Sequence, residues 1–315
     1  MTKFQKIAWN IKQFIKWFTP YGIIEYRNKK ENAVKRAIRI SRRHKKKEIV
    51  NYFKNLDKTN LDSEILEVID YLQNNPFSVF PYDFTKQYIA DNIDVFTDKK
   101  DNMMYILHEN KRMYFPKGWE EEEIQNYYNR LLIEQDIHSP HRYESDTVHV
   151  EDGDIVADIG AAEGFFALSN IEKTKKVYLF ECDGGWIEAL EKTFERWKEK
   201  IVIVNKFISD HTQGDSITLD DYLNGNEINF IKADIEGDET RLLQGAKKTF
   251  ANAKKLQMVL CAYHKENDAK ELQKELTTQH FQTEFSKRYM LFIYDSELRE
   301  PYLRRGIIRA RFSAE

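Results

Sequence analysis

The chain of 315 residues is 41% hydrophobic, which is enough to bury one large core or two modest ones. Its two cysteines, Cys182 and Cys261, are too few for a disulfide framework and are not spaced as metal ligands, so a cytoplasmic protein is expected. The net charge of −3 hides an asymmetry, because residues 1–50 hold 15 lysines and arginines against 3 acidic residues. That segment predicts an anionic partner, either a membrane surface or nucleic acid.

Residues 1–50 are predicted to form a basic helical segment. Between Phe4 and Phe18 apolar residues recur at helical spacing, with lysines off the stripe and tryptophans at its borders. Such a helix is typical of one lying in the plane of a membrane, and equally of one packed on the rest of the protein. The basic run at 27–47 has few aromatic residues to stack on bases, so nucleic acid is disfavoured. We therefore expect residues 1–47 either to bind an anionic membrane surface, at the inner face of the cell membrane, or to pack on the rest of the protein.

Residues 51–150 have the pattern of an α+β connector, which we assign to the substrate side. Short runs rich in β-branched and aromatic residues alternate there with polar turns, between two amphipathic helices. The predicted elements are helices at 61–72, capped by Asp62 or Ser63, and at 120–136, with strands at 93–96, 104–107 and 112–115.

Residues 151–315 alternate regularly between strand and helix patterns, which predicts a doubly wound α/β fold whose parallel sheet ends in antiparallel strands. In such a sheet, ligands bind outside the carboxyl ends of the strands. The predicted strands are 155–159, 177–182, 201–208, 230–233, 256–262, 283–285, 289–294 and 307–311. One helix is predicted to start at 163, and four others are predicted at 186–197, 219–223, 239–250 and 268–277.

The stretch VADIGAAEGFF, residues 156–166, lies at the first crossing from strand to helix. Gly160 and Gly164 let the backbone turn sharply there, but their spacing departs from the G-x-G-x-x-G pattern of dinucleotide sites. Glu163 would repel a phosphate, whereas Asp158 can accept from an ammonium group. A cationic ligand without phosphate, such as S-adenosylmethionine, is therefore favoured over NAD.

Glu181 ends the second predicted strand, 17 residues after Gly164, where a carboxylate can bind both hydroxyls of a ribose. Acids are common at strand ends, so Glu181 indicates a methyl-donor site only in combination with the glycine turn. A dinucleotide site and a turn without a ligand remain open on the spacing alone.

Four motifs in the second half of the chain are similar to those of the FkbM-type methyltransferases. The resemblance covers about residues 139–295, and three upstream motifs are similar to a bacterial branch associated with surface polysaccharides. The four motifs are DIGAAEG at 158–164, ITLDDY at 217–222, IKADIEGDE at 231–239 and LLQGA at 242–246, and the upstream ones are FPYDF at 80–84, MYF at 113–115 and SPHRY at 139–143.

The resemblance implies a Rossmann-like, mostly parallel seven-stranded class I methyltransferase domain at residues 151–315, behind a helical and an α+β extension. It implies an S-adenosylmethionine-dependent O-methyltransferase that acts on a sugar hydroxyl of a glycan or surface-polysaccharide precursor. A small-metabolite O-methyltransferase and a non-catalytic binding module that keeps the fold are the alternatives. The predicted cofactor-binding set is Asp158, Gly160, Ala161, Ala162, Gly164, Phe165, Glu181, Ser209 and Asp234.

Four polar residues at the ends of the fourth and fifth strands are the predicted catalytic groups. Asp234, flanked by Lys232 and Glu236, would lie beside the reacting methyl group, since alternation points the three to one side. His264 is the predicted general base because histidine titrates near neutral pH. The alternative is that these residues have no catalytic role and form a solvated acidic strand end with a surface histidine.

Two further roles are considered for these residues and their upstream neighbours. Asp234, Glu236 and His264 are an alternative set of ligands for a divalent metal, ranked below metal-free catalysis. His141, Tyr143 and His264 are the predicted contacts to the acceptor, whereas the alternative for His141 and Tyr143 is a packed linker.

Overall fold

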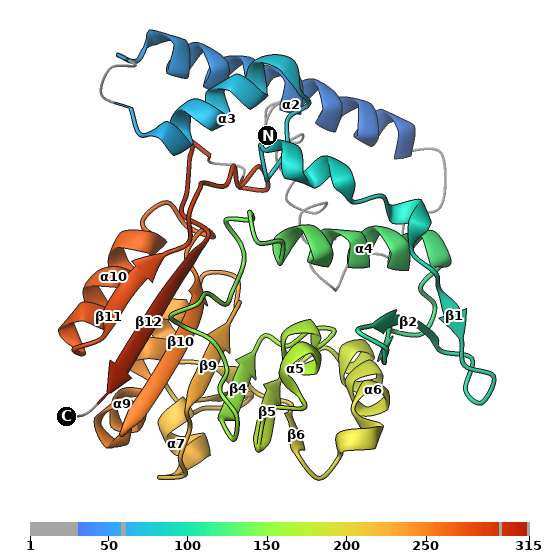
Figure 1. Cartoon of the computed structure of the whole chain (residues 1–315), viewed down its shortest axis with the longest axis vertical. Coiled ribbons are helices and arrows are strands. Elements are labelled where there is room, and N and C mark those ends of the chain that lie inside the picture. Colours follow the sequence, from blue (N-terminus) through green and yellow to red (C-terminus); the bar gives the residue numbers. More distant parts are fainter. Residues whose placement is uncertain (1–30, 58–60, 296–297, 314–315) are drawn as a thin grey trace. The chain divides into compact units, whose positions relative to one another are not determined.

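The computed structural model describes residues 31–57, 61–295 and 298–313, so the predicted helix at 4–18 lies outside the described residues (Figure 1). The chain divides into two compact units. The first holds the residues up to Thr85 with Lys287–Arg304, and the second holds Lys86–Ser286 with the residues from Arg305 onward. This division follows packing, whereas the predicted segments 1–50, 51–150 and 151–315 follow composition and pattern, so the one does not test the other.

The first unit is built on two helices, α2 (Glu31–Asn55) and α3 (Ser63–Asn74). Ile49 and Phe53 of α2 are buried, and Asp62 caps α3 by accepting from the amide of Glu64, as the sequence indicates. Tyr82 and Tyr289 join distant parts of this unit through two hydrogen bonds between hydroxyl and backbone. The predicted strand at 289–294 is wrong, because Met290 forms only an isolated bridge with Arg304. No helix of the described segments is long and apolar enough to cross a bilayer.

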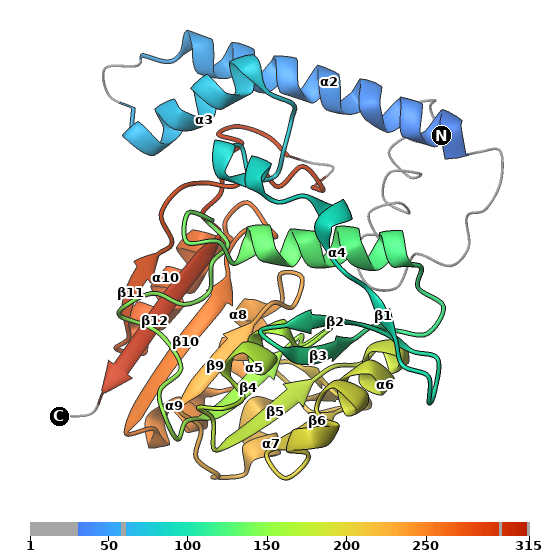
Figure 2. The ribbon, with the colours of Figure 1, turned by 45° about the vertical axis from the view of Figure 1, so that its right-hand side comes forward.

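The second unit contains a seven-stranded sheet in which β12 alone runs opposite to the other six strands. Figure 2 shows the strands side by side in the order β11-β12-β10-β9-β4-β5-β6. This confirms the predicted Rossmann-like, doubly wound and mostly parallel fold. The strands are β4 (Ile155–Ile159), β5 (Lys176–Phe180), β6 (Ile201–Val204), β9 (Phe230–Ala233), β10 (Lys255–Cys261), β11 (Gln282–Phe285) and β12 (Ile307–Ser313).

The order of the strands sets where a ligand can bind. The chain goes outward from β4 through β5 to β6, and then returns to place β9 on the other side of β4. The crevice at such a switch point, outside the carboxyl ends of β4 and β9, is the binding position of doubly wound folds. The connecting helices are α5 (Phe165–Asn170), α6 (Gly184–Thr193), α7 (Leu219–Leu223), α8 (Glu239–Gln244), α9 (Lys247–Asn252) and α10 (Asp268–Thr278).

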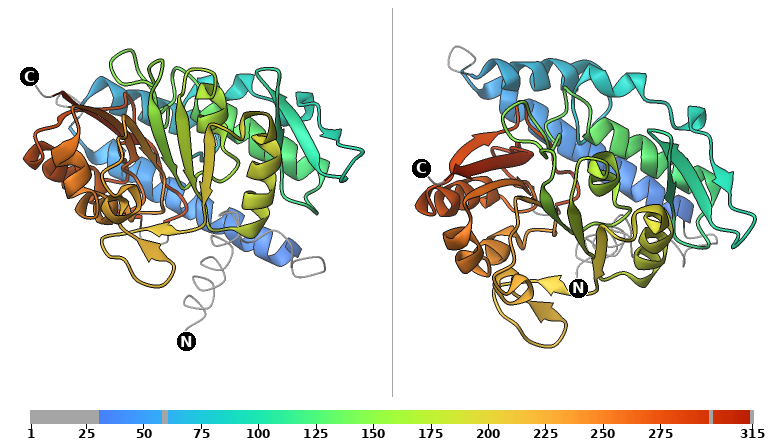
Figure 3. Two further views of the ribbon diagram at one scale, coloured as in Figure 1. Left: turned by 90° about the horizontal axis from the view of Figure 1, so that it is seen from below. Right: turned by 60° about the horizontal axis from the view of Figure 1, so that its bottom comes forward.

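Residues of the second unit that precede β4 cover the carboxyl edge of the sheet. Helix α4 (Glu121–Glu134) begins with a capping box at Glu120 and Glu123, and it lies across that edge (Figure 2). A small antiparallel sheet of β1 (Phe96–Thr97), β2 (Met104–His108) and β3 (Lys111–Tyr114) lies beside α6 (Figure 3). Helix α4 is thus the element placed to exclude water from the binding edge.

Several predicted boundaries are wrong for identifiable reasons. The strand predicted at 201–208 ends at Val204, and Phe207–Ile208 (β7) pairs instead with Ser216–Ile217 (β8). The helix predicted at 239–250 breaks at Gly245, where a side chain would overlap with the carbonyl oxygen of Ser209. The strand predicted at 93–96 is only Phe96–Thr97, after a 3₁₀ turn at Ala90–Asn92. The helix predicted at 186–197 ends at Thr193 and is followed by a 3₁₀ turn at Glu195–Trp197.

Candidate active site

The glycine turn after β4 is held in a conformation that requires glycine. Gly160 has φ +72°, and a Cβ atom there would overlap with the carbonyl oxygen of Asp234 at the end of β9. Gly164 has φ +76°, and a Cβ atom there would lie 2.8 Å from Leu190 and from Phe194 of the following helix region. The first glycine therefore lets β4 and β9 meet at the switch point, and the second lets α5 start close to α6.

A carboxylate ties this turn to the next strand end. Glu181 accepts from the amide of Ala162 at 2.9 Å and from the amides of Cys182 and Asp183 at 2.7 Å each. Two loops at the carboxyl edge are thus fixed to one side chain, because a carboxylate that accepts several backbone N–H bonds is strongly held. Glu181 lies where the sequence predicts the ribose contact, next to the glycine turn.

Beneath the turn lies a buried ion pair. The Lys232 ammonium is 3.0 Å from Asp158 Oδ1 and donates to the carbonyl oxygen of Gly160 at 2.7 Å. Burial by itself would lower the pKa of Lys232, but the charges of Asp158 and Asp234 outweigh burial and raise it. The ammonium group that Asp158 meets in this structure is therefore that of Lys232, which holds the turn from inside the sheet.

Asp234 is the centre of a polar cluster at the end of β9. The Tyr143 hydroxyl donates to Asp234 Oδ2 at 3.2 Å, His264 Nε2 lies 3.4 Å from Oδ1, and His141 Nε2 lies 4.0 Å from Oδ2. Burial raises the pKa of the Asp234 carboxyl, but His264 and Lys232 outweigh burial, so the net shift is downward. Asp234 is thus ionised at neutral pH, with its side chain 26% exposed. The structure brings four predicted site residues, His141, Tyr143, Asp234 and His264, together here.

The two histidines of this cluster are in opposite protonation states at neutral pH. His264 has Asp234 at Nε2 and Glu239 at Nδ1, each at 3.4 Å. Burial would lower the pKa of His264, but the hydrogen bond to Glu239 and the charge of Asp234 raise it to about 9. Burial lowers the pKa of His141 to about 4, and its Nε2 faces the Tyr263 hydroxyl at 3.1 Å. His264 is therefore an imidazolium with a carboxylate on each nitrogen, whereas His141 is neutral.

Glu236 lies at the rim of the cluster. Its side chain is 65% exposed, its backbone has φ +58°, and its carboxylate is 3.9 Å from His264 Nε2. The chain leaves the strand after Ala233, so the alternation that groups Lys232, Asp234 and Glu236 on one side does not continue to Glu236.

The remaining members of the predicted cofactor set are placed as follows. Ala161 is buried, and its amide donates to the carbonyl oxygen of Phe180. Phe165 packs against His108 with ring centroids 4.2 Å apart. Ser209 donates to Asp210 Oδ1 at 3.1 Å, and its carbonyl oxygen lies against Gly245. Ala162 and Gly164 lie within the turn itself.

Three further acidic residues belong to this site, of which the sequence analysis gave a role only to Glu163. Glu239 is 1% exposed and orients His264. Glu163 accepts from the Tyr127 hydroxyl at 2.6 Å, and burial raises the pKa of Glu134 on α4 to about 8, with Asp234 and Glu163 contributing. The signal for Glu239 is its position directly after the acidic strand end, at the start of a predicted helix.

Two groups of described residues could ligate a metal ion. Asp234, Glu239 and His264 place ligand atoms within 4.8 Å of one another, as do His141, Asp234 and Cys261. Glu239 thus replaces Glu236 in the predicted set. A single ion takes only one nitrogen of an imidazole, and His264 turns a different nitrogen to each carboxylate, so the first group would have to rearrange to bind one.

The fold and this site define the class of the protein. A glycine turn lies at the switch point of a doubly wound sheet, with an acid at the end of the next strand and an acidic strand end opposite, and this arrangement is the one expected of an S-adenosylmethionine-dependent methyltransferase. Residues 159–292 match the model of the methyltransferase FkbM domain. The matched stretch covers 134 of the 315 residues, so this part of the chain is similar to the FkbM methyltransferase domain.

Other comparisons are weaker. No curated protein matches the chain. The chain spans 53% of the length of the first structure below, and with TM-scores under 0.5 none of these likenesses adds to the identification. The structures are methyltransferase FkbM from Methylobacillus flagellatus KT (17% identity, 60% of this chain, TM-score 0.43), M. jannaschii TYW2 in complex with AdoMet (12% identity, 71% of this chain and 94% of that one, TM-score 0.40) and precorrin-6y C5,15-methyltransferase from Geobacter metallireducens GS-15 (12% identity, 53% and 84%, TM-score 0.37).

Proposed function

We propose that this methyltransferase transfers the methyl group of S-adenosylmethionine to a hydroxyl of a sugar, on a glycan or a surface-polysaccharide precursor. The observation that carries the transfer to oxygen is Asp234, an ionised carboxylate at the carboxyl end of β9 beside the glycine turn. Support for a sugar comes from the resemblance of residues 139–295 to the polysaccharide branch of the family.

The residues of the site fit S-adenosylmethionine. Glu163 and Glu181 make the edge acidic, which suits a sulfonium cation and opposes a pyrophosphate. Glu181 and the turn from Gly160 to Gly164 would hold the donor. When bound, S-adenosylmethionine supplies an electrophilic methyl group.

The chain itself must orient the acceptor hydroxyl and take its proton. Asp234 is placed to accept that proton, because His264 and Tyr143 fix its two oxygens and leave part of the carboxylate exposed. His264 is already protonated at neutral pH, so it orients Asp234 and stabilises its charge. The neutral His141, 4.0 Å from Asp234, can share the proton afterwards.

The test is methyl transfer from labelled S-adenosylmethionine to a panel of free sugars, sugar nucleotides and small hydroxylated metabolites. Transfer to a sugar, lost in Asp234→Asn, is expected. Transfer only to small metabolites would replace the sugar by the alternative acceptor class. A folded protein that does not bind S-adenosylmethionine at high micromolar concentration would contradict the enzymatic proposal as a whole.

We also propose that residues 1–47 hold the enzyme on an anionic membrane, where lipid-linked glycans are built. The support is the net positive charge of the segment. Each lysine or arginine near such a surface contributes about 1 kcal/mol, so binding should weaken steeply with salt. Sedimentation with phosphatidylglycerol liposomes at low and high salt tests this, and a full-length chain that ignores the liposomes at low salt would contradict it.

A further inference from the structure

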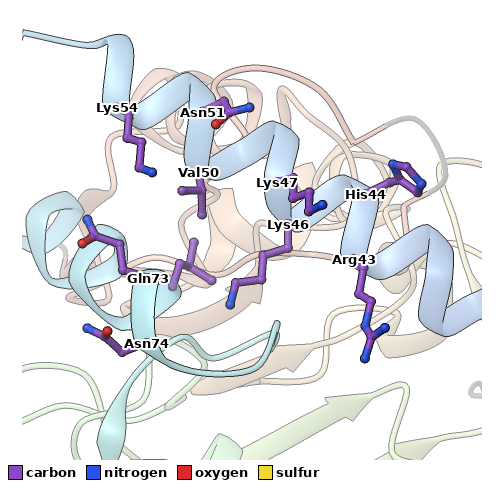
Figure 4. A pocket seen from close by; sticks show the side chains of 10 residues that line it. Arg43, His44, Lys46, Lys47, Val50, Asn51, Lys54, Gln73 and Asn74 are labelled. Carbon is purple, nitrogen blue, oxygen red and sulfur yellow. The ribbon is translucent and has the colours of Figure 1, made fainter.

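A basic groove runs between α2 and α3 within the first unit (Figure 4). Its volume is about 1060 Å³, and it is lined by residues of these two helices. Four of them are cations, Arg43, Lys46, Lys47 and Lys54, and none of the ten described residues that line it is acidic. We call this the α2–α3 groove.

The cations form one stripe along α2. Arg43, Lys46, Lys47, Val50 and Lys54 follow the spacing of a single helix face, so their side chains leave α2 on the same side. Figure 4 shows Lys46 and Lys54 projecting from α2 toward α3. The first three cations fall within about one helical turn, which concentrates three positive charges over roughly 6 Å of the axis.

These charges are available for a ligand. Lys45, outside the groove, is paired with Glu48 at 3.0 Å and also donates to the carbonyl oxygen of Leu298. By contrast, no carboxylate of the described residues pairs with Arg43, Lys47 or Lys54, and all three are exposed. Lys46 donates to the carbonyl oxygen of Asn75, which fixes one wall of the groove. A cluster of unpaired cations that is not neutralised by the protein favours binding of a multivalent anion.

The shape of the groove selects among anions. A membrane surface is flat and contacts a convex helix face, whereas a groove between two helices admits a discrete group. Asn51, Gln73 and Asn74 add amide groups to the lining, which can donate to phosphoryl oxygens and also bind hydroxyls. Three cations within one turn, next to neutral amides, match a diphosphate attached to a sugar.

We propose that the α2–α3 groove binds a diphosphate group, and that this is the diphosphate on which the sugar acceptor is carried. The second half of this statement rests on the proposed function, whereas the first half does not. The groove would thereby recognise activated or lipid-linked sugars by their carrier group, while the hydroxyl to be methylated is selected elsewhere.

The closing experiment uses the full chain and inorganic pyrophosphate, measured by calorimetry. In Arg43→Gln/Lys47→Gln, affinity for pyrophosphate should fall about tenfold to thirtyfold, since each cation at contact distance in water is worth about a factor of five. The matched control, Lys198→Gln/Lys254→Gln, removes the same charge at two exposed lysines of the second unit and should change affinity less than about twofold. Equal affinities in the two double variants would overturn the proposal.

A second arm tests whether the acceptor carries the diphosphate. With a sugar nucleotide as acceptor, the groove variant should raise KM while kcat stays unchanged, and with the free sugar it should change neither. If no sugar is methylated by any variant but pyrophosphate binding still depends on Arg43 and Lys47, the proposed function fails and the groove assignment is supported. The proposal would also be overturned if Arg43 and Lys47 were needed for binding to phosphatidylglycerol vesicles or to single-stranded RNA but not for binding to pyrophosphate. Such a result would favour a membrane or nucleic acid as the partner.

Discussion

His264 should make the stability of the protein depend on pH above neutrality. In the folded protein its pKa is raised to about 9 from the ordinary value of 6.5, with the side chain 6% exposed between Asp234 and Glu239. Because the folded pKa is the higher one, the stabilisation is fully present below pH 6.5 and is lost as the pH rises through about 9. The shift corresponds to about 3 kcal/mol of unfolding free energy across that window.

The perturbation is His264→Gln, which keeps a polar side chain and removes the titration. Urea unfolding of both proteins at about pH 6, 7.5 and 9.5 gives the difference in unfolding free energy, which should shrink by about 3 kcal/mol between the first and last pH. Glu134, with its pKa raised to about 8, also loses stabilisation as the pH rises, but it does so in both proteins and cancels in the difference. His280→Asn, at an exposed left-handed position that asparagine tolerates, is the control.

A difference that stays constant from about pH 6 to about pH 9.5 would refute the assignment of His264 as an imidazolium. The same result would restore His264 as a general base that is neutral at working pH. A turnover rate that rises with pH through a single ionisation at about pH 9 would also favour His264 as the base, because a base must lose its proton before it can accept one from the acceptor.

Three further predictions address the turn, the cofactor and the proton. Gly160→Ala should lower the unfolding free energy by about 2–4 kcal/mol, because it combines a left-handed backbone with an overlap at Asp234; thermal unfolding near that of the wild type would contradict this geometry of the turn. Glu181→Ala should weaken S-adenosylmethionine binding by about 1.5–3 kcal/mol in calorimetry, and an unchanged affinity in a folded variant would remove Glu181 from the site. Asp234→Asn should lower turnover about 10²–10⁴-fold, and a chelator should leave wild-type turnover unchanged; loss with the chelator and recovery with Mg²⁺ would favour the metal alternative.

Much of the sheet can be predicted from the sequence because buried parallel strands are short apolar runs with clear ends. The strands Ile155–Ile159 and Phe230–Ala233 are predicted to the residue, and the spacing of the glycines locates the turn between β4 and α5. Errors occur where a distant contact decides the local structure. The break at Gly245 depends on the backbone of Ser209, which is far away in the chain and leaves no periodic signal near the break.

In the candidate site, the positions of the residues can be predicted from the sequence, but their charge states cannot. Strand ends place Asp234, Glu181 and His264 at one edge, so their proximity follows from the topology. Their charge states do not, because the pKa of His264 depends on Glu239, which approaches its second nitrogen only in the folded helix α8. The buried pair of Asp158 and Lys232 is likewise hidden, since neighbouring parallel strands bring the two together in a register that no sequence spacing reveals.

The acidic edge around the glycine turn also bears on how a catalytic cycle would end. Glu163, Glu181, Asp234 and Glu239 outnumber the cations near the turn, so the edge carries a net negative charge. The methyl donor is a sulfonium cation, whereas the thioether left after transfer is neutral at sulfur. The attraction that retains the donor is therefore absent for the spent cofactor, and turnover itself switches off part of the binding energy. An edge of this charge would favour replacement of the neutral product by fresh donor.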